Sequence, residues 1–149
     1  MKLLATTTAW LALTSAGLAL DGEFRIHDPS TLLQCNGKYY TYGTGGTTLV
    51  SADGYTWHRG VRPSRSGMAP DGIQIGDRYY LYVARNIGAQ PRAAINMIWN
   101  KTLDPDSPDY QWVEGGVVVS SDGYEDCNAI DPGLFLDPNT GRLWLVYGS

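Results

Sequence analysis

The stretch FRIHDPSTLLQCNGKYYTYGTGG, from Phe24 to Gly46, predicts a β-hairpin with an unexpected charged residue in front of it. Asn36-Gly37 is the strongest two-residue hairpin signal, and it separates an apolar run from a run rich in tyrosine. A hairpin does not need the His27-Asp28-Pro29 segment before its first strand. The place of Asp28 at the mouth of an apolar strand therefore has to be explained by the rest of the chain.

The residues after this hairpin continue a pattern of short strands. The chain has 18 glycines and 8 prolines, which punctuate short runs rich in Tyr, Val and Trp. Strands are expected at 47–51 and 56–59, on either side of a turn at Ala52-Asp53-Gly54. Together with the hairpin they form a first unit of four antiparallel strands.

Two further units follow the same plan. The second is expected to start at Met68-Ala69-Pro70-Asp71, to turn at Gly76-Asp77, and to contain strands at 78–83, 93–99 and 110–113. The third is expected to start at 128–132, to turn at 137–141 and to run to Tyr147, where the sequence stops two residues later.

The three units open alike, with Asp28, Asp71 and Asp131 each followed by Pro or Gly and then by an apolar strand. Four-strand units that repeat at such spacing are the sequence signature of a β-propeller. A β-sandwich with coincidentally similar hairpins is the alternative. The fold class predicted is therefore all-β, of the propeller type.

A propeller would explain the aspartates, because the first strand of each blade lines the central channel. Asp28, Asp71 and Asp131 would then converge at the rim of one funnel. The prolines after Asp28 and Asp131 are expected to hold the preceding backbone extended. Carboxylates crowded together repel one another, which favours one protonated and one ionised group, as in glycoside hydrolysis.

Residues 1–19 are expected to form a secretory signal peptide, which leaves residues 20–149 as the mature domain. Lys2 is followed by an apolar run at 3–13 and by small residues at 15–19, with cleavage expected after Ala19. The apolar run is too short to span a membrane. With a net charge of -4 and no basic stripe, the chain is not expected to bind nucleic acid or a membrane surface.

Cys35 and Cys127 are the only two cysteines in the sequence. Cys35 is expected at the far end of an inner strand and Cys127 near the funnel, so no disulfide is predicted between them. Asn100-Lys101-Thr102 matches a glycosylation sequon, although a chance match is an equal alternative.

Several segments in combination resemble glycoside hydrolase family 43, and within it the arabinanases. They are RIHDPSTLL (25–33), GMAPDG (67–72), LDPDSPDYQWVEGGVVVSS (103–121), NAIDPGLFLD (128–137) and RLWLVYGS (142–149). This resemblance implies a five-bladed β-propeller, of which only about two and a half blades are present here. It also implies inverting hydrolysis of α-1,5-linked arabinan in plant cell walls.

The resemblance assigns roles to individual residues. Asp28 matches the general base that activates water, and Asp131 matches the carboxylate that orients the catalytic acid and raises its pKa. Asp71 could contact substrate or simply hold its loop, and His27 and Asn128 are expected to contact the sugar. Met68 departs from the bulky aromatic residue that the family usually has there.

The catalytic acid of the family is a glutamate in a later blade, so the chain is interpreted as an N-terminal piece that is inactive alone. Glu114, expected in a turn, and Glu125, expected near the funnel, are weak internal candidates for that acid. No cofactor or metal-ligand spacing is recognisable, although the family resemblance allows a calcium ion on the propeller axis. The partner expected is the polysaccharide alone, and the full-length protein is expected to be a secreted monomer.

Two other functions remain open on the sequence. One is an exo-acting α-L-arabinofuranosidase or β-xylosidase of the same family. The other is a non-catalytic carbohydrate-binding propeller, which the paired Asp28 and Asp131 disfavour because clustered carboxylates are not needed for binding alone.

Overall fold

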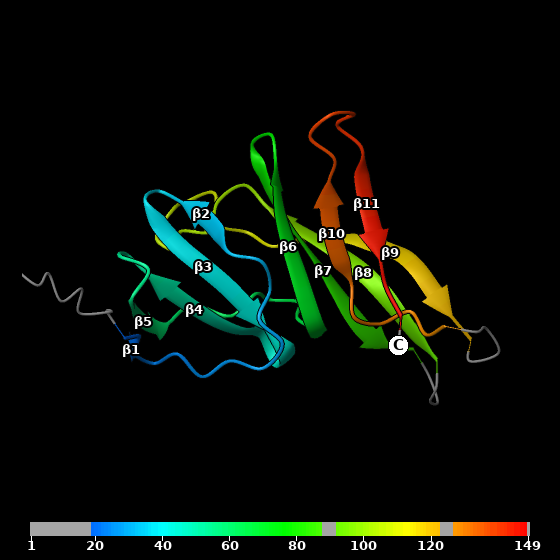
Figure 1. Cartoon of the computed structure of the whole chain (residues 1–149), viewed down its shortest axis with the longest axis horizontal. Coiled ribbons are helices and arrows are strands. Elements are labelled where there is room, and N and C mark those ends of the chain that lie inside the picture. Colours follow the sequence, from blue (N-terminus) through cyan, green and yellow to red (C-terminus); the bar gives the residue numbers. More distant parts are fainter. Residues whose placement is uncertain (1–18, 88–91, 123–126, 149) are drawn as a thin grey trace, which may run out of the picture.

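The computed structural model describes residues 19–87, 92–122 and 127–148. Within these ranges the regular structure is β-sheet, apart from one short 3-10 turn, η1 (Thr44–Gly46). The strands form two larger sheets and one two-stranded hairpin, and the hairpin overlies the second sheet next to its first strand (Figure 1). Blades I, II and III are the names used for these three sheets.

Blade I contains the predicted hairpin and the two strands after it. Its strands are β2 (Leu33–Cys35), β3 (Lys38–Gly43), β4 (Thr47–Ser51) and β5 (Thr56–Arg59). Asn36 and Gly37 have φ of 50° and 73°, the positive pair that a tight type I′ hairpin needs. All four predicted strands are confirmed. The pairing of β1 (Asp21–Gly22) alongside β5, in parallel, was not predicted.

Blade II contains β6 (Met68–Ile75), β7 (Arg78–Asn86), β8 (Ala93–Asn100) and β9 (Val113–Ser121). The prediction of a last strand at 110–113 was wrong, because β9 begins at Val113 and continues through Gly115-Gly116. The ladder between β8 and β9 shifts register twice here, and Gly116 has φ of 97°. These glycines therefore mark a bulged strand and not a turn.

Blade III is the hairpin of β10 (Gly133–Leu136) and β11 (Leu143–Val146), joined by the predicted turn at 137–141. The carboxylate of Asp137 closes that turn by accepting hydrogen bonds from Asn139 N and Thr140 Oγ1. One face of the hairpin is open to solvent, with Phe135, Trp144 and Val146 exposed to 59%, 53% and 66%.

The main core lies between blades I and II. Its buried side chains include Tyr40 and Tyr42 of β3, Leu81 of β7 and Ile98 of β8. Trp112 from the loop before β9 packs edge-on against Tyr42, with ring centroids 5.6 Å apart. Apolar faces of two sheets, each unable to bury itself alone, are thus buried against one another.

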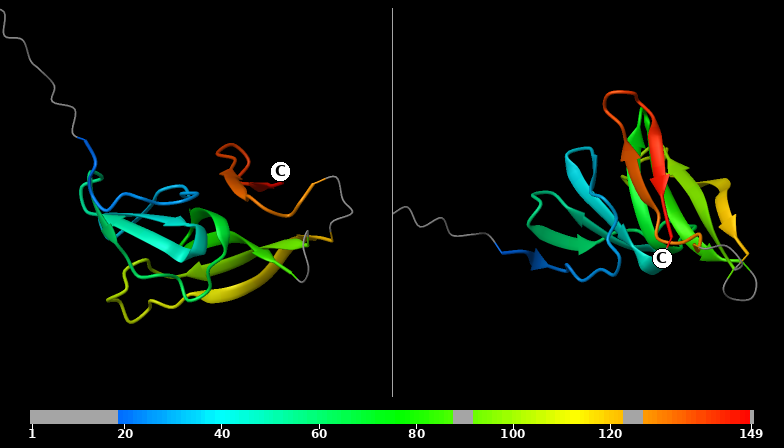
Figure 2. Two further views of the ribbon diagram at one scale, coloured as in Figure 1. Left: turned by 90° about the horizontal axis from the view of Figure 1, so that it is seen from below. Right: turned by 45° about the vertical axis from the view of Figure 1, so that its right-hand side comes forward.

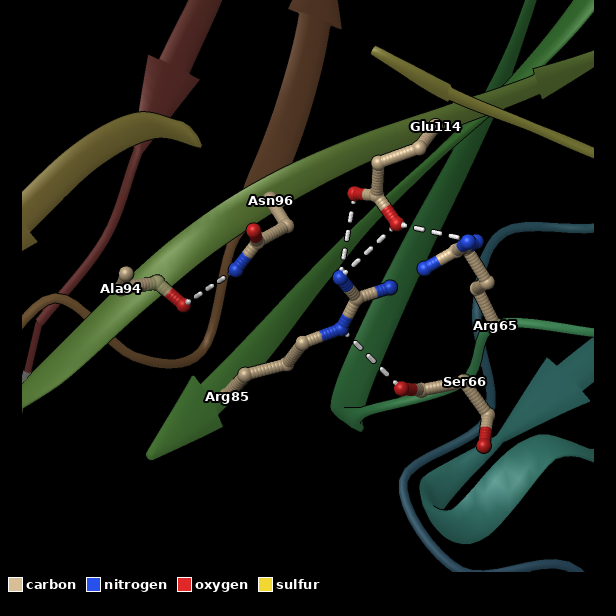
Figure 3. Close-up of polar contacts among 6 residues, drawn as sticks. All are labelled: Arg65, Ser66, Arg85, Ala94, Asn96 and Glu114. Atoms are coloured by element: carbon tan, nitrogen blue, oxygen red, sulfur yellow. Dashed lines mark hydrogen bonds and ion pairs between the residues drawn. The ribbon is translucent and has the colours of Figure 1, made fainter. Parts of the chain in front are cut away.

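The loop that joins blades I and II is pinned by an ionic cluster (Figure 3). Arg85 of β7 donates from Nη1 to both carboxylate oxygens of Glu114, at 3.0 and 3.1 Å. Its Nε donates to the carbonyl of Ser66 in that loop, and Arg65 lies 3.6 Å from the same carboxylate. Glu114 was expected in a solvated turn, so its place in β9, bound to Arg85, is a correction.

The two cysteines are free, as predicted, with Cys35 buried and Cys127 exposed. The asparagine of the glycosylation sequon, Asn100, is fully buried, with 0% exposure. Its Oδ1 accepts hydrogen bonds from the backbone N–H groups of Thr102 and Gln111. The side chain that a glycan would need is therefore part of the interior.

The predicted signal peptide falls almost entirely on residues 1–18, outside the described residues. In the part of the chain that is described, no helix has the length and apolar character to cross a membrane.

Candidate functional site

The first strands of the three blades come together at one end. β6 contacts β2 and β3 on one side and β10 on the other, and it lies between them in Figure 1. The left-hand view in Figure 2 shows the hairpin of blade III standing clear of the sheet of blade II. The segments leading into these strands line an open surface hollow of about 330 Å³, formed by Asp28, Pro29, Thr31, Ala69, Pro70, Asp71, Asp131, Pro132 and Gly133. Asp28, Asp71 and Asp131 all line this hollow, as predicted for the rim of the funnel, whereas the catalytic roles of Asp28 and Asp131 stay predictions.

Each blade reaches this hollow through an unusual backbone conformation. Asp28, Ala69 and Asp131 have φ of 49°, 40° and 51°, and each is followed by a proline. We call the segment that begins at each of these residues the opening segment of its blade. The expectation of an extended backbone at Asp28 and Asp131 was therefore wrong. Non-glycine residues at positive φ cost about 1–3 kcal/mol and cluster at functional sites.

This shared conformation also corrects the alignment of the three blades. The residue of blade II that corresponds to Asp28 and Asp131 is Ala69, because all three have a positive φ and each is followed by a proline. Asp71 lies two residues further on, inside β6. The sequence comparison matched the blades by their aspartates, whereas the prolines give the true register.

Asp28 is held at one oxygen and open at the other. Its Oδ2 accepts a hydrogen bond from Thr44 Oγ1 at 2.7 Å and lies 2.9 Å from His27 Nδ1. Oδ1 makes no hydrogen bond or ion pair to any described residue. The Asp28 side chain is 42% exposed. This carboxylate is oriented by its neighbours and still has an oxygen facing solvent.

Thr44 was missed by the sequence analysis. Besides donating to Asp28, its hydroxyl oxygen accepts a hydrogen bond from the backbone N–H of Ala69 at 2.8 Å. Thr44 belongs to η1, directly after β3, so it joins the opening segment of blade I to that of blade II. A threonine between glycines, in the segment Gly43 to Gly46, is a weak signal that the sequence offers for it.

Asp71 has both carboxylate oxygens occupied by backbone donors. Oδ1 accepts from Thr31 N at 3.0 Å and from Gly72 N at 2.9 Å, and Oδ2 accepts from Leu134 N at 2.7 Å. Of the two roles left open for Asp71, these contacts support holding the structure together. Asp71 is nevertheless one of the residues that line the hollow.

Asp131 is exposed, and it makes no hydrogen bond to any described residue. The segment before it is anchored, since Ser121 Oγ donates to Asn128 Oδ1 at 2.8 Å and accepts from Ala129 N at 3.0 Å. Asn128 is not among the residues that line the hollow, so its predicted sugar contact stays a prediction.

His27 is 80% exposed and its described side-chain contact is with Asp28. It too is absent from the lining of the hollow, and its contact with sugar remains a prediction. Glu23 and Glu114, the glutamates within the described ranges, are also absent from that lining. Glu125 lies outside the described residues.

The described residues do not by themselves supply a calcium site where the three inner strands meet. The groups that point there include three backbone N–H donors, which are paired with the Asp71 carboxylate and cannot ligate a cation. Within the same ranges no group of three or more His, Cys, Asp or Glu is placed to hold a metal. An axial calcium ion therefore remains a prediction from family resemblance alone.

Comparison with known proteins places this geometry in a family. A family model described as Glycosyl hydrolases family 43 matches residues 44–149. The chain is 34% identical to the extracellular exo-alpha-(1->5)-L-arabinofuranosidase ArbA of Cellvibrio japonicus, over 93% of this chain and 45% of that protein. It is 30% identical to a probable arabinan endo-1,5-alpha-L-arabinosidase A of Aspergillus flavus, over 88% of this chain and 44% of that one.

The fold comparison agrees. The structure of Cellvibrio cellulosa alpha-L-arabinanase complexed with arabinohexaose superposes with a TM-score of 0.75 at 29% identity, over 86% of this chain and 46% of the other. The prediction of the five-bladed propeller fold, present here in part, is confirmed. The chain spans less than half the length of these relatives.

Proposed function

The chain belongs to glycosyl hydrolases family 43, and on that premise we propose that it supplies the water-activating side of an inverting hydrolase acting on α-1,5-linked arabinan. The observation that carries this proposal is the meeting of Asp28 and Asp131, from different blades, in one hollow. The relatives named for arabinan hydrolysis give the substrate class.

Asp28 is the proposed general base. Thr44 and His27 hold its Oδ2, which leaves Oδ1 to accept a proton from water. The water oxygen then attacks the anomeric carbon of the arabinose unit as the bond from that carbon to the leaving oxygen breaks on the opposite side. This single displacement inverts the configuration at the anomeric carbon.

Asp131 is proposed to act through the catalytic acid and not on the sugar bond itself. A carboxylate beside a second carboxyl group disfavours ionisation of that group and keeps it protonated. The protonated group then delivers its proton to the leaving oxygen, which departs as an alcohol. Neither described glutamate lines the hollow, so the acid is proposed to come from residues other than these.

Secretion of the protein is part of the proposal. Relatives from Cellvibrio japonicus and Thermotoga petrophila are named as extracellular. The sequence pattern at residues 1–19 supports the same route for this chain. The proposed substrate, a polymer of the plant cell wall, also lies outside the cell.

A chimera tests the proposal. The chain is followed by the part of the Cellvibrio japonicus relative that lies beyond the match, and reducing-end release from debranched arabinan is measured. We expect turnover by the chimera, loss of turnover on Asp28→Ala, and none from the chain alone. Comparable turnover by the chain alone, abolished by Asp28→Ala, would contradict the external acid and turn attention to Glu125.

Exo action is the second candidate, because the Cellvibrio japonicus relative is named as an exo-enzyme while the Aspergillus flavus relative is named as an endo-enzyme. Chromatography of early products separates the two. Endo cleavage gives a ladder of oligosaccharides, whereas exo cleavage gives one product size from the first minutes. A second chimera, carrying the remainder of the Aspergillus flavus relative, shows whether the pattern follows this chain or the appended part.

A further inference from the structure

The contacts of Asp71 connect the three blades at equivalent positions. Thr31, Gly72 and Leu134 each lie three residues after the positive-φ residue of their own blade, which is Asp28, Ala69 or Asp131. All three donate their backbone N–H to the carboxylate of Asp71, at 3.0, 2.9 and 2.7 Å. One side chain thus receives the same backbone group from every blade present.

These hydrogen bonds are of the strong type. A carboxylate that accepts from backbone N–H groups makes charge-assisted bonds, which are shorter and about twice as strong as neutral ones. The bond to Leu134 is the shortest of the three and joins blades II and III. The bond to Thr31 joins blades I and II.

The donors lie close in sequence to the candidate catalytic groups. Fixing Thr31 N fixes the segment that begins at Asp28, and fixing Leu134 N fixes the segment that begins at Asp131. Asp28 and Asp131 belong to different blades, and their own side chains share no contact across the hollow within the described residues. Their separation therefore depends on what joins the segments that carry them.

We propose that Asp71 is a positioning residue, whose carboxylate sets the distance between Asp28 and Asp131 by holding the three opening segments at one point. Asp71 does not take part in the bond-breaking step, because both its oxygens are occupied. This inference rests on the proposed function for the roles of Asp28 and Asp131, but the clamp itself is a structural claim that can be tested without turnover.

The experiment uses the full chain, labelled with 15N, and the variant Asp71→Ala. We expect the amide protons of Thr31, Gly72 and Leu134 to move upfield together in the variant and to exchange at least about tenfold faster. Adding sodium formate should return all three resonances toward their wild-type positions with one saturable curve. Formamide, which has the shape of formate but no charge, should not do so.

The functional arm measures binding of arabinotriose to the same samples. We expect Asp71→Ala to bind about tenfold more weakly, equivalent to about 1.4 kcal/mol, and formate to restore the affinity. Asp53→Ala is the matched control, because Asp53 also accepts several hydrogen bonds, but within blade I alone. It should lower stability without moving the three amides or the affinity.

Asp71→Asn keeps the proposal testable if the alanine variant does not fold. An amide offers one acceptor oxygen, so either the Leu134 amide or the Thr31 and Gly72 pair should keep its position while the other moves. The proposal is overturned if the three amides of Asp71→Ala respond independently, or if formamide rescues that variant as well as formate does. If the wild-type chain alone binds no arabinotriose, the binding arm is run with the chimera and its Asp71→Ala variant, and the amide data still decide the clamp.

Discussion

The opening segments of blades I and II have the same backbone but use their carboxylates differently. Asp28 and Ala69 both stand at positive φ before a proline. In blade I the carboxylate is on that residue, keeps one free oxygen and faces the hollow. In blade II it is two residues later, on Asp71, where backbone donors occupy both oxygens.

This difference shows how a repeated unit can supply both chemistry and structure. The position before the proline directs a side chain into the hollow, whereas the position two residues on directs it to where the strands meet. A carboxylate at the first position is available to water, and one at the second joins the blades. Four predictions test this contrast, in order of decreasing effect.

The largest effect is expected for Asp28→Asn in the chimera. The amide keeps the size of the side chain and tolerates positive φ, but it cannot take a proton from water. We expect kcat for debranched arabinan to fall by about 10²- to 10⁴-fold with little change in Tm. Asp77→Asn, an exposed turn aspartate at 88% side-chain exposure, is the control and should change neither.

Thr44→Val tests the link between the opening segments of blades I and II. Valine has the shape of threonine but removes the donor to Asp28 and the acceptor for Ala69 N. Leaving that N–H without a partner should lower the free energy of unfolding by about 1–3 kcal/mol, measured by urea denaturation. In the chimera, kcat should fall while Thr44→Ser retains most of it. Equal loss in both variants would show that packing and not the hydroxyl matters.

Ala69→Gly tests whether the backbone of blade II stores strain. At φ of 40° glycine is relaxed and alanine is not. We therefore expect glycine to raise the free energy of unfolding by about 1 kcal/mol, seen as a higher urea midpoint. Ala52→Gly, in an exposed turn without positive φ, should slightly lower it. A loss at both sites would mean that the positive φ carries no cost.

The smallest effect, a change in Tm, is expected for Asp53→Asn. The carboxylate of Asp53 accepts hydrogen bonds within blade I, whereas that of Asp71 accepts them from three blades. Hydrogen bonds from the backbone of Thr56 and Tyr55, and from Ser51, lower the pKa of Asp53 below its ordinary 3.8. Its stabilising contribution is therefore complete above pH 3.8 and is lost as the pH falls further. The Tm difference between wild type and Asp53→Asn should shrink from about pH 5 toward about pH 2, as the Asp53 carboxylate takes up its proton. A Tm difference that stays constant over this range would contradict the prediction.

Most of the fold could be predicted because its turns have recognisable sequence motifs. Asn36-Gly37, Gly76-Asp77 and the turn at 137–141 each separate two apolar runs, and all three hairpins form. The pairing of Asp21–Gly22 with β5 could not be predicted, because two residues carry no periodicity. The predicted start and end of the last strand of blade II were wrong, because the sequence does not distinguish glycines at a β-bulge from glycines at a turn.

The candidate site could be predicted only in part. Asp28 and Asp131 were found because an aspartate before a proline is conspicuous at the start of a strand. The role of Asp71 was left open because the sequence does not show which backbone donors surround a carboxylate. Thr44 was missed because its importance depends on a contact across 25 residues, between its hydroxyl and Ala69 N.

The two free thiols of this molecule also make it convenient for spectroscopy. Cys127 is exposed, and it precedes Asp131 by four residues, whereas Cys35 is buried in the core. A maleimide dye at neutral pH should therefore label Cys127 selectively in the folded protein. Cys127 is not among the residues that line the hollow, so a fluorophore on it offers an optical reporter of sugar occupancy that needs no engineered cysteine.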